Sequence, residues 1–189
     1  MGVQTRSESE SPVVLGVVGR SGSGKTSFLE RLIAALQARG ISVGAVKHAS
    51  HGFQADRPGK DSHRLYESGA QAVALLSVEQ SATFVRRALP PSIEAALLAL
   101  PPGLDLVLAE GFSWEPIPRV VVRGPGRAPK ADDLAGGEVL GIVEVRAYPD
   151  DGPPCFDAHA LETIASCLVA RVAARMEPRR PFERSQEAS

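Results

Sequence analysis

Apolar residues near the start of the chain follow a strand pattern, then a helix pattern, then a strand pattern again. Residues 12–18 form an apolar run with the length and β-branched content of a buried parallel strand. From Phe28 onward the apolar residues recur at helical spacing, and this pattern stops at Gly40. A second apolar run, residues 41–47, follows almost at once. This order predicts a compact β-α-β unit with a parallel sheet.

The same patterns predict further elements downstream. They are, in chain order, a short helix at 61–69, hairpin strands at 72–76 and 82–86, a helix that opens at 90–92 and runs to Leu100, strands at 104–111, 119–123 and 139–145, and a final helix at 158–175. The glycine- and proline-rich residues 124–137 are expected to form a surface loop. We expect residues 12–176 to form one domain, after a disordered arm at 1–11 and before a flexible tail at 177–189.

The segment Gly19–Thr26 lies between the first strand and the first helix and fits the phosphate-loop pattern G-x-x-x-x-G-K-[ST]. Its glycines allow backbone conformations in which successive N–H groups point inward and form a nest for an anion. Lys25 brings a positive charge to the outer phosphates, and the Thr26 hydroxyl can bind Mg²⁺. A glycine-rich turn with an accidental Lys-Thr pair is the alternative, which the flanking strand and helix disfavour. The residues expected to bind a nucleoside triphosphate here are Gly22, Ser23, Gly24, Lys25, Thr26 and Ser27.

This context predicts an α/β fold of the P-loop NTPase type, with a mostly parallel sheet between helices in three layers and the hairpin as an extension. A hydrophobic fraction of 43% and a charged fraction of 23% are ordinary for a globular domain. The net charge of −1 gives no reason to expect nucleic-acid binding. The two cysteines lack metal-site spacing, and the sequence predicts neither a secretory signal nor a membrane span. We therefore expect a cytoplasmic protein.

An acidic residue ends the apolar run at 104–111. Four large apolar residues lead to Glu110 and then Gly111, a pattern that delivers a carboxylate to the carboxyl edge of a sheet, where ligands bind in open α/β folds. We expect Glu110 to organise Mg²⁺ or its water shell. The alternative is an exposed glutamate at the end of a strand.

A polar segment follows the second strand and should lie across the nucleotide site. Asp61 could reach the metal, so that Thr26, Asp61 and Glu110 are the expected metal ligands and Lys25, Asp61 and Glu110 the expected catalytic residues. The side chains expected to meet phosphates or line the site are Lys47, His48, Lys60 and Arg64. Alternatively, Asp61 merely caps its helix and Arg64 is a solvated charge. The irregular spacing of His48, His51 and His63 disfavours a zinc site.

Taken together, these motifs resemble one known family. The phosphate loop GRSGSGKT, the pair Lys47-His48, the segment Gly59-Lys60-Asp61-Ser62-x-Arg64 and the segment Glu110-Gly111-Phe112 are similar to those of MobB, the molybdopterin-guanine dinucleotide biosynthesis adaptor family. The resemblance covers roughly residues 13–170. Where family members often carry a Pro-Lys pair, this chain has Pro118-Arg119, which keeps a basic residue but alters its chemistry.

The resemblance implies a GTP-binding protein, usually dimeric, with weak GTPase activity and a Mg²⁺ requirement. It implies as partners a MobA-like nucleotidyltransferase, which joins GMP to molybdopterin, and molybdopterin or a molybdoenzyme. It places Gly22 to Thr26 on the phosphates, Lys47, His48, Asp61 and Arg64 around the site, and Glu110 near the metal.

The residues by themselves leave the base and the reaction open. The N/T-K-x-D loop that commonly reads guanine does not occur, although Glu144 or Asp150, and less plausibly Asp157, could replace its aspartate. A small-molecule kinase is one alternative function, but Pro58-Gly59 would make a poor helical lid over the phosphates. The other is a binding module in which the nucleotide only orders the loop at 48–60 for a partner.

Overall fold

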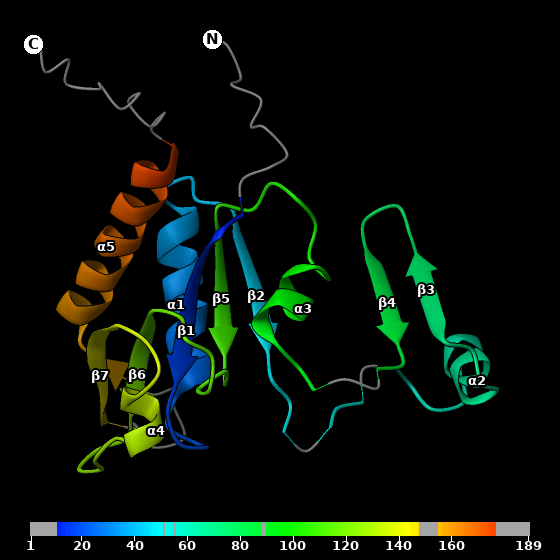
Figure 1. Ribbon diagram of the computed structural model, residues 1–189, viewed down its shortest axis with the longest axis horizontal. Helices are drawn as coiled ribbons and strands as arrows, with labels where there is room; N and C mark the ends of the chain where they lie inside the picture. The colour runs from blue at the N-terminus through cyan, green and yellow to red at the C-terminus, as the bar shows by residue number, and fades with distance from the viewer. Residues whose placement is uncertain (1–10, 51, 55, 88–89, 148–154, 177–189) are drawn as a thin grey trace, which may run out of the picture. The chain divides into compact units, whose positions relative to one another are not determined.

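The computed structural model describes residues 11–50, 52–54, 56–87, 90–147 and 155–176 (Figure 1). The chain divides into two compact units. The first unit comprises Met1–His48 and Ile93–Ser189, and the second comprises Ala49–Ser92.

The first unit is built on a mostly parallel sheet of six strands. In spatial order these are β2 (Val43–Lys47), β5 (Leu106–Glu110), β1 (Val13–Val18), β6 (Arg119–Arg123), β7 (Val139–Ala147) and β8 (Cys155–Phe156). Only β8 runs antiparallel to its neighbour in this sheet. Val17 of β1 and Lys47 of β2 both lie opposite Glu110 of β5, so the carboxyl ends of these three strands meet at one edge.

Helices cover both faces of this sheet. The helices α1 (Lys25–Gln37) and α5 (Ala158–Met176) pack against the same hydrophobic cluster, to which β5 contributes Leu106 and Leu108 (Figure 1). On the opposite face, the short helix α3 (Ile93–Leu97) packs with Ala109 and Phe112. Because successive residues of a strand point to opposite faces, a strand with apolar residues on both faces becomes the middle layer of three.

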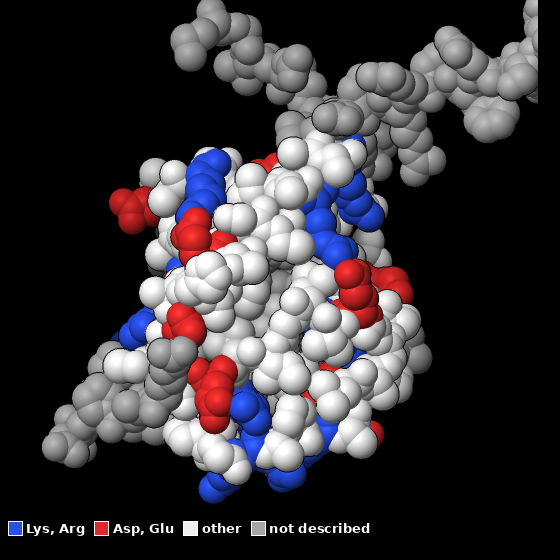
Figure 2. All heavy atoms as spheres, turned by 90° about the vertical axis from the view of Figure 1, so that its left-hand side faces the viewer, with Lys and Arg blue, Asp and Glu red and all other residues white. Residues whose placement is uncertain are grey.

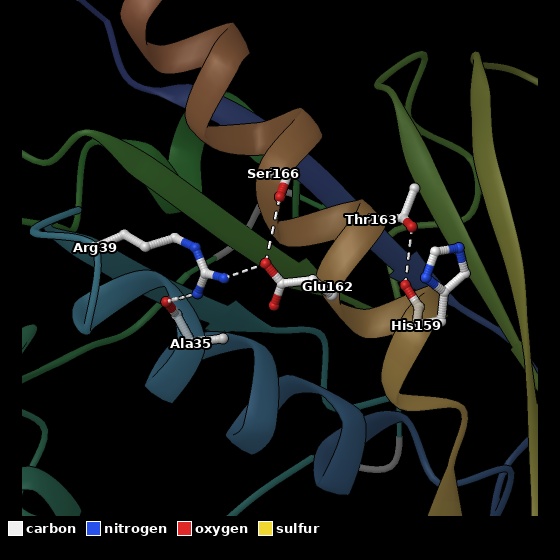
Figure 3. Close-up of polar contacts among 6 residues, drawn as sticks. All are labelled: Ala35, Arg39, His159, Glu162, Thr163 and Ser166. Atoms are coloured by element: carbon white, nitrogen blue, oxygen red, sulfur yellow. Dashed lines mark hydrogen bonds and ion pairs between the residues drawn. The ribbon is translucent and has the colours of Figure 1, made fainter.

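A polar contact at the surface joins α1 to α5 (Figure 3). The guanidinium of Arg39, just beyond α1, donates to the Ala35 carbonyl and pairs with Glu162 of α5. The same carboxylate accepts a hydrogen bond from the Ser166 hydroxyl at 3.5 Å. Exposed ion pairs contribute about 0–1 kcal/mol, so the buried side chains hold the two helices together. On the face seen in Figure 2, positive and negative side chains are interspersed and form no broad basic patch among the described residues.

The second unit contains the helix α2 (Asp61–Glu67) and an antiparallel hairpin of β3 (Ala72–Leu76) and β4 (Ser81–Val85). Val73 is its buried apolar residue, at 8% exposure. Its large exposed apolar side chains are Phe53, Leu65, Leu75, Leu76, Val78 and Val85. No helix among the described residues of the chain has the length and hydrophobicity needed to cross a membrane.

The structure confirms the predicted three-layer α/β fold, the β-α-β unit and the hairpin, and it corrects three expectations. The strand at 139–145 is not the last, because it continues to Ala147 and pairs with the two-residue strand β8. The helix α4 (Ala131–Leu134) lies in the segment expected to be a loop. The helix α3 ends at Leu97 and not at Leu100, because the N–H groups of Ala99 and Leu100 donate to the carbonyls three residues earlier and form tighter turns.

Arg119, the first residue of β6, is fully buried at 0% exposure. Its guanidinium donates to the carbonyl oxygen of Ser113 at 2.8 Å, and also to backbone carbonyls of Glu115, Ile117 and Asp132. Burial lowers the pKa of the Arg119 side chain, and the nearby charge of Asp133 partly opposes the shift. One planar donor group thus holds the segment after β5 and the helix α4 against the start of β6.

We expect Arg119→Met to lower the free energy of unfolding by about 2–5 kcal/mol, because it leaves buried carbonyl groups without their donor. Arg119→Lys should recover only part of this loss, since an ammonium cannot span the same set of carbonyls. Urea denaturation followed by the fluorescence of Trp114, the single tryptophan, measures the change. The matched control is Arg39→Met, which removes an exposed arginine and should cost at most about 1 kcal/mol. Equal losses in Arg119→Met and Arg39→Met would show that Arg119 does not hold this region.

Candidate functional site

The loop between β1 and α1 has the backbone conformation of an anion nest. Gly19, Gly22 and Gly24 have φ angles of +142°, +71° and +87°, in the region that favours glycine. A Cβ atom at Gly19 would lie 2.1 Å from the carbonyl oxygen of Val122, so no other residue fits there. Gly24 caps α1 without a side-chain hydrogen bond, and the first turn of the helix therefore presents its N–H groups to a ligand.

Lys25 extends along this loop. Its ammonium donates to the carbonyl oxygens of Gly19 at 3.0 Å and Arg20 at 2.8 Å. Burial lowers the pKa of Lys25 below that of a free lysine, and the negative charge of Glu110 partly opposes the shift. A polyphosphate in the nest would bring oxygens to this ammonium and favour its charged form.

Glu110 joins the phosphate loop to the neighbouring strands. It is nearly buried, at 9% exposure, and its Oε2 accepts a hydrogen bond from the Thr26 hydroxyl at 3.1 Å. Its Oε1 pairs with the Lys47 ammonium at 3.2 Å, and its backbone carbonyl accepts the N–H of His48 at 2.9 Å. The structure therefore brings Lys25, Thr26, Lys47, His48 and Glu110 into one cluster, and it rules out the alternative of an exposed strand-end glutamate.

The oxygens of Thr26 and Glu110 fit a magnesium ion. Mg²⁺ binds oxygen ligands at about 2.0–2.1 Å in octahedral geometry, which puts two neighbouring ligands about 2.9 Å apart. The Thr26 hydroxyl and the Glu110 carboxylate are 3.1 Å apart. These two residues would hold the ion, because a carboxylate with a hydroxyl is a donor set that Mg²⁺ accepts.

Lys60, Asp61 and Arg64 belong to the second unit, so their contact with the nucleotide remains a prediction. Within that unit, Lys60 and Asp61 line a cavity of about 620 Å³ together with Ser62 and residues of β3. Lys60 is the residue that caps α2, and it makes no side-chain cap hydrogen bond. Asp61 lies in the first turn and is not the capping residue that the alternative reading required.

Two of the residues that could recognise the nucleotide base make other contacts in the structure. Glu144 pairs with Arg123 at 2.8 Å, and Asp157 accepts the N–H of His159 at the start of α5. Asp150 lies outside the described residues, as does His51. Recognition of the base by Glu144, Asp150 or Asp157 remains a prediction.

Sequence reasoning missed two features beside this cluster. The rings of His48, Phe112 and Trp114 pack together, with the centroids of His48 and Trp114 4.7 Å apart. A cavity of about 470 Å³ lies between the phosphate loop and the end of β6 with the residues that follow it. The sequence signal for the cavity was a pair of arginines, Arg123 at the end of β6 and Arg127 in the glycine- and proline-rich segment that follows.

Comparisons with known proteins agree with this geometry. The family described as molybdopterin guanine dinucleotide synthesis protein B matches residues 14–143. A molybdopterin-guanine dinucleotide biosynthesis adapter protein of Haemophilus influenzae is 44% identical over 110 residues, which are 58% of this chain and 62% of that protein. The chain therefore spans slightly less than two thirds of that relative. The Escherichia coli adapter protein is 36% identical over 124 residues, covering 64% of this chain and 71% of that protein.

Solved structures of the same family share the fold. The crystal structure of a MobB protein homolog from Bacillus stearothermophilus superposes with a TM-score of 0.59 at 27% identity, over 85% of this chain and 98% of that one. The crystal structure of Bacillus subtilis MobB superposes with a TM-score of 0.56 at 26% identity, over 82% of this chain and 96% of that one. The family match spans well over half of the chain and contains the phosphate loop, Lys47 and Glu110. This protein therefore belongs to the molybdopterin guanine dinucleotide synthesis protein B family, MobB.

Proposed function

We propose that this chain binds GTP with Mg²⁺ at the phosphate loop and acts as an accessory protein in the synthesis of molybdopterin guanine dinucleotide. The observation that carries the proposal is the 3.1 Å contact between the Thr26 hydroxyl and the Glu110 carboxylate, at the start of the helix that also carries Lys25. Amide donors, an ammonium and two metal-binding oxygens are the groups that a magnesium-bound triphosphate requires. The guanine base is proposed from the guanine dinucleotide in the names of the relatives.

The site supports binding better than fast turnover. A bound Mg²⁺ would supply positive charge to the outer phosphates. Lys25 would hold the phosphates, while Thr26 and Glu110 would hold the metal. Because both oxygens of Glu110 already have partners in Thr26 and Lys47, this carboxylate is a poor general base for activating water. We therefore propose weak GTPase activity, with Asp61 as a further metal or catalytic group and Lys60 and Arg64 as phosphate contacts.

The partners follow from the family's pathway. An adapter for this synthesis would act with a MobA-like nucleotidyltransferase, which joins GMP to molybdopterin, and with molybdopterin or a molybdoenzyme. The proposed location is the cytoplasm. A pull-down with the nucleotidyltransferase in the presence of GTP, GDP or no nucleotide tests whether the bound nucleotide controls the association.

Lys25→Ala should weaken GTP binding about 100-fold or more, because it removes the ammonium that faces the phosphates. Fluorescence titration with a labelled GTP analogue measures this loss. The matched control is Arg39→Gln, which also removes one positive charge but lies beyond the far end of α1, about 20 Å from the phosphate loop. Unchanged affinity in Lys25→Ala would contradict nucleotide binding at this loop.

Glu110→Gln should leave metal-free GTP binding within about threefold, since the amide keeps the size of the side chain. It should abolish the Mg²⁺ dependence of both affinity and phosphate release, because a neutral amide is a weak ligand for a hard cation. Titration of Mg²⁺ against phosphate release measures the effect, and Glu138→Gln, at a surface pair with Arg171, is the control. Normal Mg²⁺-dependent hydrolysis by Glu110→Gln would remove this residue from the metal site. Transfer of the terminal phosphate to a small acceptor instead of water would indicate a kinase.

We also propose that two copies of the chain associate through the second unit. A two-stranded hairpin by itself is marginally stable in water, and this one exposes 81% of Leu76 and 54% of Val85. Sedimentation at micromolar concentration should show a dimer, and Leu76→Lys should shift it toward monomer. Leu98→Lys changes a leucine of the first unit that is 88% exposed, and it should leave the dimer intact. A wild-type protein that sediments only as a monomer would contradict the proposal.

A further inference from the structure

The second unit is attached to the first by two connections of the chain. One connection leaves the first unit at His48, the residue after β2, and the other returns to it at Ile93, the first residue of α3. Both of these residues belong to the first unit. The contacts that hold His48 and Ile93 in the first unit therefore determine how firmly the second unit is attached.

The loop that begins at Glu110 holds the first of these residues. The backbone N–H of His48 donates to the carbonyl oxygen of Glu110 at 2.9 Å. The centroid of the imidazole ring lies 4.7 Å from that of Trp114 and 5.9 Å from that of Phe112. Phe112 is buried at 3% exposure, so His48 packs against a ring that the core keeps in place.

The same loop holds the second residue. The backbone N–H of Ile93 donates to Oε1 of Glu115 at 3.1 Å. Both residues are buried, at 5% and 8% exposure, so this hydrogen bond to a carboxylate is shielded from water. The first N–H groups of a helix have no acceptor within the helix, and Glu115 supplies one for α3. Both connections therefore begin on residues that contact one loop, residues 110–115.

Internal contacts hold this loop together as one piece. The backbone N–H of Glu115 donates to the carbonyl oxygen of Phe112 at 3.3 Å. The buried guanidinium of Arg119 donates to the carbonyl oxygens of Ser113 and Glu115. A segment with such shared contacts opens as a cooperative unit and not one residue at a time.

The first residue of the loop is the proposed metal ligand. The carboxylate oxygens of Glu110 contact Thr26 and Lys47, and its backbone carbonyl holds His48. A metal ion on this carboxylate is lost in any local opening that displaces Glu110. A ligand that binds only the closed arrangement makes such openings rarer, and with them the release of the residues that the loop holds.

We propose that Glu115 is a positioning residue that couples metal binding at Glu110 to the attachment of the second unit. Mg²⁺ with a nucleotide at the phosphate loop stabilises residues 110–115, and this loop then holds both His48 and Ile93 more firmly. The nucleotide site thereby controls how rigidly the unit with the exposed hairpin is attached. This inference rests on the proposed function and extends it.

Hydrogen exchange of single amides, followed by NMR on the full chain loaded with GDP, tests this coupling. Mg²⁺ at about 100 times its dissociation constant makes openings that lose the metal about 100-fold rarer. The exchange of the backbone N–H groups of His48 and Ile93 should therefore slow by about tenfold to 100-fold. The control is the N–H of Gly40, which donates to the Gln37 carbonyl in the turn after α1 and should exchange at an unchanged rate.

Glu115→Ala removes the acceptor of the Ile93 N–H. In this variant Mg²⁺ should still slow exchange at His48 but no longer at Ile93. Because coupling is reciprocal, the affinity of the GDP-loaded variant for Mg²⁺, measured by calorimetry, should fall about threefold to tenfold, while metal-free GDP binding stays unchanged. Glu115→Gln keeps a carbonyl acceptor and should restore both properties. Glu94→Ala, which removes an exposed carboxylate from the first turn of α3, is the matched control.

The outcomes separate this inference from the proposed function. Mg²⁺ binding to the GDP-loaded protein without slower exchange at His48 and Ile93 would overturn the coupling and leave the proposed function standing. This measurement uses the unaltered protein and does not depend on the folding of any variant. Slowing at Ile93 that persists in Glu115→Ala, or an equal loss of Mg²⁺ affinity and metal-free GDP affinity in that variant, would also overturn the coupling. Absence of GDP binding to the unaltered protein would overturn the proposed function and this inference together.

Discussion

The hydrogen bond from the Thr26 hydroxyl to the Glu110 carboxylate is the contact on which the site depends. These two residues are far apart in sequence, and the parallel pairing of β1 with β5 brings them together by ending both strands at the same edge. Because β2 pairs with β5 in the same direction, Lys47 arrives beside the same carboxylate. A cluster of one hydroxyl, one carboxylate and one ammonium is thus a direct consequence of strand order.

The helix layers fix the register of this sheet by burying both of its faces. The side of β5 that carries Leu106 and Leu108 packs under α1 and α5, and the side that carries Ala109 packs under α3. A strand buried on both sides cannot slip by one residue without exposing a whole apolar set. The position of Glu110 at the end of this strand is therefore as fixed as the core itself.

Buried polar groups shape the surroundings of the site. The guanidinium of Arg119 holds the loop that carries Trp114 and the helix α4 at the start of β6. Ser23 Oγ and Arg123 Nε show the opposite situation, since each is buried without a hydrogen-bond partner among the described residues. Satisfied buried donors stabilise a structure, whereas buried donors without a partner cost free energy.

The sequence by itself determined the β-α-β unit, the phosphate loop, the hairpin and the placement of Glu110 at a strand end, because each depends on residues close together in the chain. Periodicity of apolar residues and the fixed spacing of glycines are local signals, and they can be recognised without knowledge of the fold. Resemblance of the motifs also gave the family, which the comparisons confirmed. The roles expected for Lys60, Asp61 and Arg64 remain predictions, since these residues belong to the separate second unit.

Only the tertiary structure decided which polar residues are buried and what they contact. The sequence marked Arg119 only as a basic residue after Pro118, and its burial follows from carbonyl groups that Ser113 and Asp132 bring from two other segments. The strand β8 has two residues, which is too short for a periodic pattern of apolar residues. It forms because it can pair with the edge of β7. The cavity beside the phosphate loop likewise has walls from separate segments. Burial and cavities arise from the packing of distant residues, and no local pattern in the sequence encodes them.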